Sequence, residues 1–190
     1  MHEKRFDPRK LDKLNNPERL KALPPKYIVE KVGLSSPKVI ADVGAGTGFF
    51  SVAFADMFPK SRIHALDISE TMVSWMTENI TPDYPNIEAR LMQDNQLTLD
   101  DNTVDFLFMI NLHHELDAPV KMLTECKRVL KPGGKIAISD WKKKETAGGP
   151  PLAIRYEITA VEQELNEAGF GKINSHQDLP TNFLTIATKQ

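Results

Sequence analysis

Four residues near the start of the chain combine a carboxylate with a turn that carries few side chains. Asp42 precedes Gly44, Gly46 and Gly48, so the segment has the spacing D-x-G-x-G-x-G. Such a turn lets the backbone approach a ligand that a Cβ atom would exclude. A dinucleotide-binding turn has the spacing G-x-G-x-x-G and offers bare N–H groups to a pyrophosphate. Because a carboxylate beside the turn would repel phosphates, the pattern favours a nucleotide-like ligand that carries positive charge.

Polar residues also follow the other apolar segments that are predicted to be strands. They are Asp67, Asp94 with Asn95, Asn111 with His113 and His114, and Asp140. The carboxyl ends of parallel strands meet at one edge of a sheet, so we expect these side chains to converge there. Asp67 comes 19 residues after Gly48, where an acid can accept hydrogen bonds from both ribose hydroxyls of an adenosine. Ile68 would then pack on the adenine. Asp94 would accept a hydrogen bond from the amino group of the adenine, with Asn95 nearby.

The elements that would position these residues alternate between strands and helices. Strands are predicted at 38–43, 62–67, 87–92, 104–110 and 135–139. Apolar residues at helical spacing lie between the strands. Two short runs at 173–176 and 183–187, joined by a turn, predict a closing antiparallel hairpin. The pattern predicts a doubly wound α/β fold with a mostly parallel sheet, helices on both faces and an antiparallel edge.

Local signals predict two helix boundaries in the second half of the chain. Pro132-Gly133-Gly134 would end the helix that starts near Pro119. Thr159-Ala160-Val161-Glu162 has the form of a capping box, so the last helix would begin there. Gly169 is placed to end that helix, because glycine readily adopts the left-handed conformation that follows a helix.

The composition limits the classes of function that the chain can serve. A length of 190 residues fits one domain, and a formal net charge of −2 provides no basic field for nucleic acid. The single cysteine, Cys126, excludes an internal disulfide and a cysteine-cluster metal site. No apolar run reaches the length of a membrane span, and the charged N-terminus does not lead into a signal-peptide core. We therefore expect a soluble, cytoplasmic protein without a nucleic-acid partner.

Four segments, in their order along the chain, resemble the motifs of the class I S-adenosylmethionine-dependent methyltransferases. They are Asp42-Val43-Gly44-Ala45-Gly46-Thr47-Gly48, Leu66-Asp67-Ile68-Ser69, Asp105-Phe106 with Asn111-Leu112-His113-His114, and Arg128-Val129-Leu130-Lys131-Pro132-Gly133-Gly134. Within that class the chain is similar to the small-molecule branch that includes quinone-biosynthesis methyltransferases. The resemblance implies a Rossmann-like, seven-stranded sheet in the order 3-2-1-4-5-7-6 with strand 7 antiparallel. It also implies S-adenosyl-L-methionine as the cofactor and a small molecule as the methyl acceptor.

The resemblance also implies where the cofactor is held. The contacts map onto Gly44, Gly46, Asp67, Asp94 and Asn111. The expected cofactor site further includes Asp42, Ala45, Ile68 and Asn95. All of these residues lie in the glycine turn, or at or just after the end of a predicted strand, which is where a doubly wound sheet binds its ligand.

His113 and His114 follow the fourth predicted strand, where an acceptor would lie. Imidazole titrates near neutral pH, so one of them, preferably His114, can serve as the base if the acceptor must lose a proton. The alternative is a histidine that only orients the loop through hydrogen bonds. A metal site at His-His-Glu is disfavoured, because neighbouring histidines in an extended loop point apart and the helical H-E-x-x-H spacing is absent.

We therefore expect a single methyltransferase domain over residues 1–190. Residues 1–26 would form an N-terminal arm that acts as a tether or a lid, 27–140 the cofactor-binding core, and 141–190 a substrate-side loop and the closing hairpin. Two alternatives stay open. One is a non-catalytic module that binds S-adenosylmethionine. The other is an NAD-dependent oxidoreductase, which would need G-x-G-x-x-G and a catalytic pair such as Tyr-Lys. The sequence predicts neither the acceptor atom nor the oligomeric state.

Overall fold

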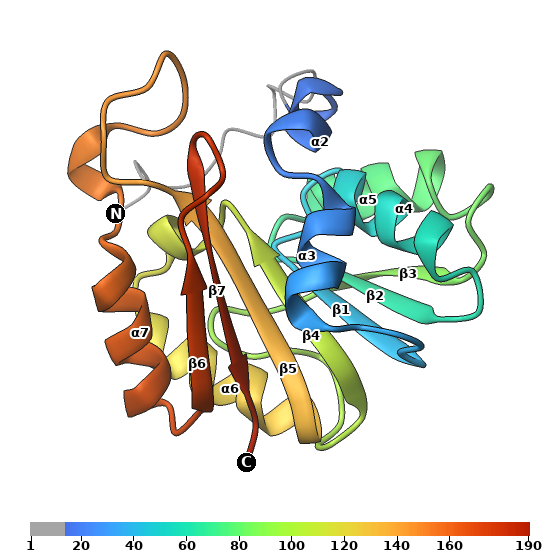
Figure 1. Ribbon diagram of the computed structural model, residues 1–190. Coiled ribbons are helices and arrows are strands. Elements are labelled where there is room, and N and C mark those ends of the chain that lie inside the picture. The colour runs from blue at the N-terminus through green and yellow to red at the C-terminus, as the bar shows by residue number, and fades with distance from the viewer. Residues whose placement is uncertain (1–13) are drawn as a thin grey trace.

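The computed structural model describes residues 14–190, with a seven-stranded sheet at the centre (Figure 1). The strands lie in the order β3-β2-β1-β4-β5-β7-β6, which confirms the predicted order. They span Val39–Val43 (β1), Arg62–Asp67 (β2), Ile87–Leu91 (β3), Val104–Ile110 (β4), Leu130–Trp141 (β5), Gly171–His176 (β6) and Asn182–Thr188 (β7). β7 pairs antiparallel with β5 and β6, whereas the pairs from β3 across to β5 are parallel.

Helices cover both faces of the sheet, as predicted (Figure 1). They span Glu18–Ala22 (α2), Pro25–Val32 (α3), Phe49–Met57 (α4), Glu70–Asn79 (α5), Pro119–Val129 (α6) and Ile158–Glu167 (α7), with 3-10 turns at His113–Glu115 (η1) and Leu152–Ile154 (η2). α3, α4 and α5 pack on one face, and α6 and α7 pack on the other. The buried side chains therefore form two cores that are separated by the sheet.

The position of β4 between the two cores explains its almost entirely apolar sequence. Phe106 and Phe108 enter the core beneath α4, where the ring of Phe108 stacks on Phe54 with centroids 4.4 Å apart. Leu107 and Met109 enter the core beneath α6 and α7. Since successive side chains of a strand point to opposite faces, a strand covered by helices on both sides must be apolar at nearly every position.

Pro132-Gly133-Gly134 does not end the preceding helix, so that prediction is wrong. α6 already ends at Val129, and the three residues belong to β5. The N–H of Gly133 donates to the carbonyl oxygen of Lys189, and the N–H of Lys189 donates to the carbonyl oxygen of Gly134. This backbone pairing with the chain after β7 draws the segment into the sheet, and a register shift against β4 accommodates it as a bulge.

The last helix begins before the predicted capping box, which is therefore also wrong. α7 starts at Ile158, so Thr159 lies inside the first turn, and Glu157 at the N-cap makes no side-chain capping bond. Tyr156 and Ile158 pack against the core beneath α6, so apolar burial fixes the start of the helix without a polar cap. The predicted end is confirmed, because Gly169 follows the helix with a left-handed φ of 80°.

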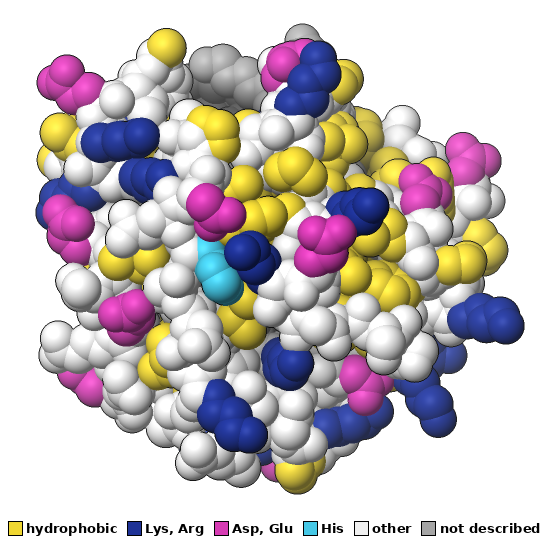
Figure 2. Space-filling model, in the orientation of Figure 1, with side chains coloured by type: hydrophobic (Ala, Val, Ile, Leu, Met, Phe, Trp, Pro, Cys, Tyr) yellow, Lys and Arg dark blue, Asp and Glu magenta, His cyan; other side chains and the backbone are white. Residues whose placement is uncertain are grey.

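The carboxyl ends of the parallel strands lie at one end of the molecule. α2, the segment after β5 and the turn between β6 and β7 gather at this same end (Figure 1). Residues 1–13 of the predicted arm lie outside the described residues, and the rest of the arm forms α2 and the start of α3. Figure 2 shows Lys and Arg side chains dispersed among Asp and Glu side chains on the visible face. In the stretch 14–190, none of the helices has the length and apolar character needed to span a membrane.

Candidate functional site

A cavity of about 1150 Å³ lies at the carboxyl ends of the central strands. All the predicted site residues except Asp42 and His113 line it. They are Gly44, Ala45, Gly46, Asp67, Ile68, Asp94, Asn95, Asn111 and His114. The structure thus brings together residues from four separate segments of the chain, as expected from the convergence of parallel strand ends.

The glycine turn carries the backbone from β1 across the end of β2 to α4. The N–H groups of Gly44 and Ala45 both donate to the carbonyl oxygen of Leu66, at 2.8 and 2.9 Å. Gly44 has a left-handed φ of 73°, and a Cβ atom placed on it would lie 2.7 Å from the side chain of Leu112. A side chain at this position would therefore strain the turn and collide with the opposite wall. The turn presents bare backbone to the cavity.

Asp67 ends β2 on the cavity wall, next to the glycine turn. Its Oδ2 accepts a hydrogen bond from the N–H of Gly46 at 2.7 Å, and its Oδ1 accepts one from the N–H of Ser69 at 2.9 Å. Burial raises the pKa of this carboxyl, while its backbone hydrogen bonds act in the opposite direction. Each carboxylate oxygen can accept two hydrogen bonds. Besides these bonds and a further backbone interaction with Ile68, Asp67 keeps acceptor capacity toward the cavity for the hydroxyls of a ligand.

Asp42 lies beneath the turn and not on the cavity wall, unlike the other acids of the predicted site. It is 3% exposed, and its Oδ2 accepts a hydrogen bond from Ser51 Oγ of α4 at 2.6 Å. The pKa of Asp42 is raised to about 7, mainly by burial and also by the negative charge of Asp67. The hydrogen bond from Ser51 and the positive charge of Arg19 act in the opposite direction. The position indicates that Asp42 supports the turn by tying β1 to α4.

The raised pKa of Asp42 makes the stability of the protein depend on pH in a defined window. Between its ordinary value of 3.8 and about 7, the folded protein holds a proton that the unfolded chain has released. The free energy of unfolding should therefore fall as pH rises through this window, by at most about 1.4 kcal/mol per pH unit from this group. Asp42→Asn should remove that contribution. Urea unfolding of both proteins at several values between pH 4 and 8 measures it, and parallel profiles would contradict the assignment.

His114 lies on the cavity wall and is held by Asp140 at the end of β5. Its Nδ1 lies 2.8 Å from Asp140 Oδ1, and its backbone N–H donates to Oδ2 at 3.0 Å. Since an ionised carboxylate only accepts hydrogen bonds, Nδ1 carries the hydrogen and Nε2 is left as the basic atom. Burial lowers the pKa of His114, but the hydrogen bond and charge of Asp140 and the charge of Glu115 outweigh it, so the net pKa is raised. Asp140 thus orients a base and strengthens it.

His113 does not line the cavity, although it precedes His114 in the same 3-10 turn. It is fully buried, its Nε2 lies 2.6 Å from Glu164 Oε2 of α7, and its ring meets Tyr156 edge-on. The two histidines therefore anchor η1 to different elements, His114 to β5 and His113 to α7. This matches the structural alternative for His113 and leaves His114 as the candidate base. Within the described part of the chain, no group of three or more His, Cys, Asp or Glu residues could hold a metal ion.

The described part of the N-terminal arm forms another wall of the cavity. Leu14, Asn16, Arg19, Ala22 and Leu23 line it. The guanidinium of Arg19 lies over the rings of Phe49 and Phe50 at the start of α4, 5.4 and 5.0 Å from their centroids, and donates to the carbonyl oxygen of Leu14. Burial lowers the pKa of Arg19, while the charge of Asp42 raises it. A desolvated cation thus stands beside the glycine turn.

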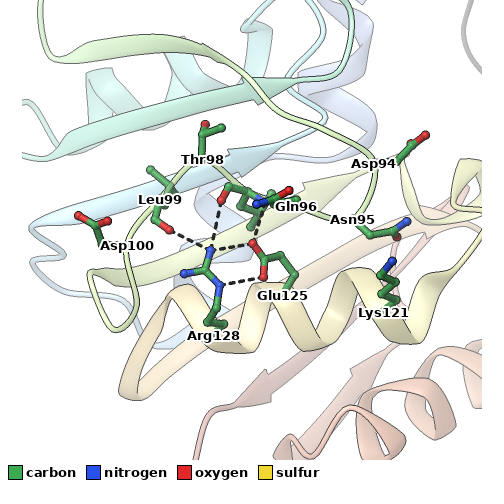
Figure 3. A pocket seen from close by; sticks show the side chains of 10 residues that line it. Asp94, Asn95, Gln96, Thr98, Leu99, Asp100, Lys121, Glu125 and Arg128 are labelled. Atoms are coloured by element: carbon green, nitrogen blue, oxygen red, sulfur yellow. Dashed lines mark hydrogen bonds and ion pairs between the residues drawn. The ribbon is translucent and has the colours of Figure 1, made fainter.

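Two residues of α6 hold the segment that carries Asp94 and Asn95 (Figure 3). Glu125 Oε1 accepts a hydrogen bond from the N–H of Leu97 at 2.8 Å. Nη2 of Arg128 donates to the carbonyl oxygens of Leu97 and Leu99 and to Glu125. These contacts border a second hollow of about 620 Å³, which shares Asp94 and Asn95 with the main cavity. The polar groups of Glu125 and Arg128 are used in hydrogen bonds to the segment 97–99 and to each other. We therefore interpret these two residues as structural supports of the segment and not as a second ligand site.

Sequence reasoning missed the role of three residues at the site: Arg19, Asp140 and Arg155. Arg19 lies on a short polar helix and carries no spacing signal. The sequence predicts Asp140 at a polar strand end, but the pairing of Asp140 with His114 depends on β4 and β5 being neighbours in space. Arg155 sits in a polar loop whose shape no local pattern predicts, although it is only 6% exposed in the fold.

Comparisons with known proteins agree on one family. The family model described as "Methyltransferase domain" matches residues 40–134. Over 98% of this chain and 100% of the other, the structure resembles a solved SAM-dependent methyltransferase from Aquifex aeolicus, with 35% identity and a TM-score of 0.92.

Curated relatives match a large part of the chain at lower coverage of their own length. A malonyl-[acyl-carrier protein] O-methyltransferase from Methylococcus capsulatus is 31% identical over 72% of this chain and 53% of its own length. A ubiquinone/menaquinone biosynthesis C-methyltransferase from Hydrogenovibrio crunogenus is 30% identical over 70% of this chain and 52% of its own. The chain therefore spans about half the length of the curated relatives it matches.

Proposed function

Because the chain belongs to the S-adenosylmethionine-dependent methyltransferases, we propose that its cavity binds S-adenosylmethionine and that it methylates a small-molecule acceptor. The observation that carries this proposal is the position of Asp67. It places two carboxylate oxygens beside a glycine turn, on the wall of a cavity that His114 also lines. The relatives named above act, by their names, as an O-methyltransferase and a C-methyltransferase, which supports the same reaction class.

The residues of the cavity fit S-adenosylmethionine better than a phosphate-bearing cofactor. The acceptor capacity of Asp67 suits the two ribose hydroxyls, and the turn spacing G-x-G-x-G with Asp42 beside it differs from the G-x-G-x-x-G turn that holds a pyrophosphate. The bare backbone at Gly44 and Gly46 leaves room for the chain of the methionine part to pass close to the turn. The cavity therefore suits a cationic nucleoside.

We assign the two ends of the cofactor to opposite sides of Asp67. Ile68, Asp94 and Asn95 would hold the adenine, through apolar packing and hydrogen bonding at its edge. Arg19 would meet the α-carboxylate, since a desolvated guanidinium binds a carboxylate strongly. Asn111 follows β4 on the cavity wall, and its side-chain oxygen, which accepts a hydrogen bond from Asn182 Nδ2 at 2.7 Å, would face the α-ammonium group.

The cavity has room for an acceptor beside the cofactor. Its volume of about 1150 Å³ exceeds the range of about 300–1000 Å³ that is usual for the site of one small ligand. Part of the cavity wall is apolar and includes Leu116, Trp141, Pro150, Pro151 and Ile154. Such a wall excludes water and orients an acceptor, which are the main protein contributions to a displacement reaction.

S-adenosylmethionine supplies, when bound, a methyl group made electrophilic by a sulfonium. The chain must then align the acceptor atom and take up its proton, where the acceptor carries one. His114 is placed for the second task, because Asp140 fixes its ring with Nε2 as the basic atom, 3.8 Å from Glu115 Oε1. When the acceptor is methylated, His114 Nε2 would receive the proton that the acceptor loses. The positive charge on the imidazolium would be balanced by Asp140.

A methyl-transfer assay tests the proposed function. The protein would be incubated with S-adenosylmethionine labelled in the methyl group and with catechol, 2-naphthol, ethanolamine, malonate or a cell extract. Transfer of label to at least one acceptor is expected. Tight binding of S-adenosylhomocysteine without transfer to any sample would instead support the non-catalytic module. Stabilisation by NAD, without stabilisation by S-adenosylhomocysteine, would support the oxidoreductase.

A further inference from the structure

The loop between β5 and α7 forms a wall of the cavity, and its one regular element is the 3-10 turn η2. Its residues Gly149, Pro150, Pro151 and Ile154 line the acceptor side. A loop of this length does not keep one shape unless its backbone polar groups find partners. Arg155, near its end, supplies those partners.

Arg155 binds the loop from inside. Its Nε donates to the carbonyl oxygen of Pro150 at 2.9 Å, and its Nη2 donates to that of Gly148 at 2.9 Å. Its Nη1 donates to the carbonyl oxygen of Lys144 at 2.7 Å, to Thr146 Oγ1 at 2.8 Å and, at 3.4 Å, to the carbonyl oxygen of Lys142. One guanidinium therefore gathers backbone from both halves of the loop, a task that suits its planar fork of donors.

None of the five atoms that accept hydrogen bonds from Arg155 is charged: four are backbone carbonyl oxygens and one is the hydroxyl oxygen of Thr146. The residue is 6% exposed, and its guanidinium lies 5.3 Å from the ring centroid of Trp141. Burying a cation among neutral partners costs free energy unless its hydrogen bonds are satisfied. All three guanidinium nitrogens of Arg155 donate hydrogen bonds within the loop, so the side chain fixes the loop backbone that forms this wall.

Trp141 connects the loop to the end of β5. A Cβ atom on Gly149, which has a φ of 96°, would lie 2.7 Å from the ring of Trp141, so the loop backbone rests directly on the indole. Trp141 and Gly149 both line the cavity. Trp141 also follows Asp140, the residue that orients His114. A shift of the loop would therefore change the acceptor wall close to the candidate base.

We propose that Arg155 is a positioning residue that fixes the acceptor wall and so determines which acceptors the protein accepts. This inference rests on the proposed function, since it assigns the loop side of the cavity to the acceptor. Arg155 also acts on the candidate base through its positive charge. Among the described residues, Asp140 on β5 and Glu115 on η1 raise the pKa of His114, and Arg155 lowers it.

Two variants separate the shape of the Arg155 side chain from its charge. Arg155→Lys keeps the charge and loses the planar fork, whereas Arg155→Met loses both. Lys143→Met is the matched control, because it removes an exposed cation from the same loop. Hydrogen–deuterium exchange of residues 142–155 needs no acceptor and is measured first. We expect at least tenfold faster exchange there in both Arg155 variants, unchanged exchange in the central strands, and no change in the control.

Binding and kinetics then test specificity. We expect the Kd of S-adenosylhomocysteine to stay within twofold of the unmodified protein, and the KM of the best acceptor from the methyl-transfer panel to rise at least tenfold. The pH midpoint of kcat/KM should move upward in Arg155→Met but not in Arg155→Lys. Unchanged loop exchange in both variants would overturn the inference, as would an unchanged KM in an active enzyme. If the unmodified protein transfers no methyl group, the proposed function and the specificity part of the inference fail, and the exchange data still decide the positioning.

Discussion

Replacing Asp67 by asparagine should weaken the binding of S-adenosylhomocysteine by about 100-fold or more. Two charge-assisted hydrogen bonds to the ribose would be lost or reversed, and each is worth about 1.5–3 kcal/mol. The amide of asparagine would also turn a donor toward the N–H of Gly46 or of Ser69, which now donate to the two carboxylate oxygens. Titration calorimetry with S-adenosylhomocysteine measures the effect.

The control for this experiment is Asp83→Asn, which removes an exposed carboxylate outside the cavity lining. The affinity of Asp83→Asn for S-adenosylhomocysteine should equal that of the unmodified protein. The melting temperature of Asp67→Asn without ligand shows whether the glycine turn has kept its fold. An Asp67→Asn protein that folds normally and binds with unchanged affinity would contradict the assignment of the ribose site.

Replacing His114 by asparagine should lower kcat by about 100- to 10,000-fold for an acceptor that must lose a proton. The affinity for S-adenosylhomocysteine should stay within about twofold, because the basic atom acts on the acceptor. In the unmodified protein, kcat/KM should rise with pH through the raised pKa of His114, since only the neutral ring can accept a proton. His114→Asn should lose this rise.

Two further variants distinguish catalysis from a structural effect at His114. Asp140→Asn removes the group that raises the pKa of the ring, so the rise in kcat/KM should move to lower pH. His113→Gln alters the neighbouring buried histidine and its bond to Glu164. It should lower the melting temperature and keep the pH dependence. Loss of the pH dependence in His113→Gln, with its retention in His114→Asn, would reverse the roles assigned to the two histidines.

The sheet and the strand-end residues that line the cavity are predictable from the sequence because their signals are local. The glycine turn, the acid that ends β2 and the apolar run of β4 are each recognised from only a few consecutive residues. Parallel strands then bring such strand ends together without further information. The segment Pro132-Gly133-Gly134 shows the limit of this reasoning, because its pairing with Lys189 involves the other end of the chain.

The acceptor side could not be predicted, because its contacts join residues that no sequence pattern connects. Arg155 binds backbone carbonyls, which every residue possesses, so nothing in the composition of the loop marks it. The difference between His113 and His114 likewise depends on which neighbour each ring reaches, Glu164 of α7 or Asp140 of β5. Asp42 was predicted to face the ligand, but its hydrogen bond to Ser51 holds it beneath the turn.

A crystal structure with S-adenosylhomocysteine tests the central claim most directly. We expect the ribose hydroxyls within hydrogen-bond distance of the two oxygens of Asp67, the adenine against Ile68, and the sulfur facing the space beside His114. Density for the ligand outside this cavity, or inside it with the ribose away from Asp67, would contradict the account.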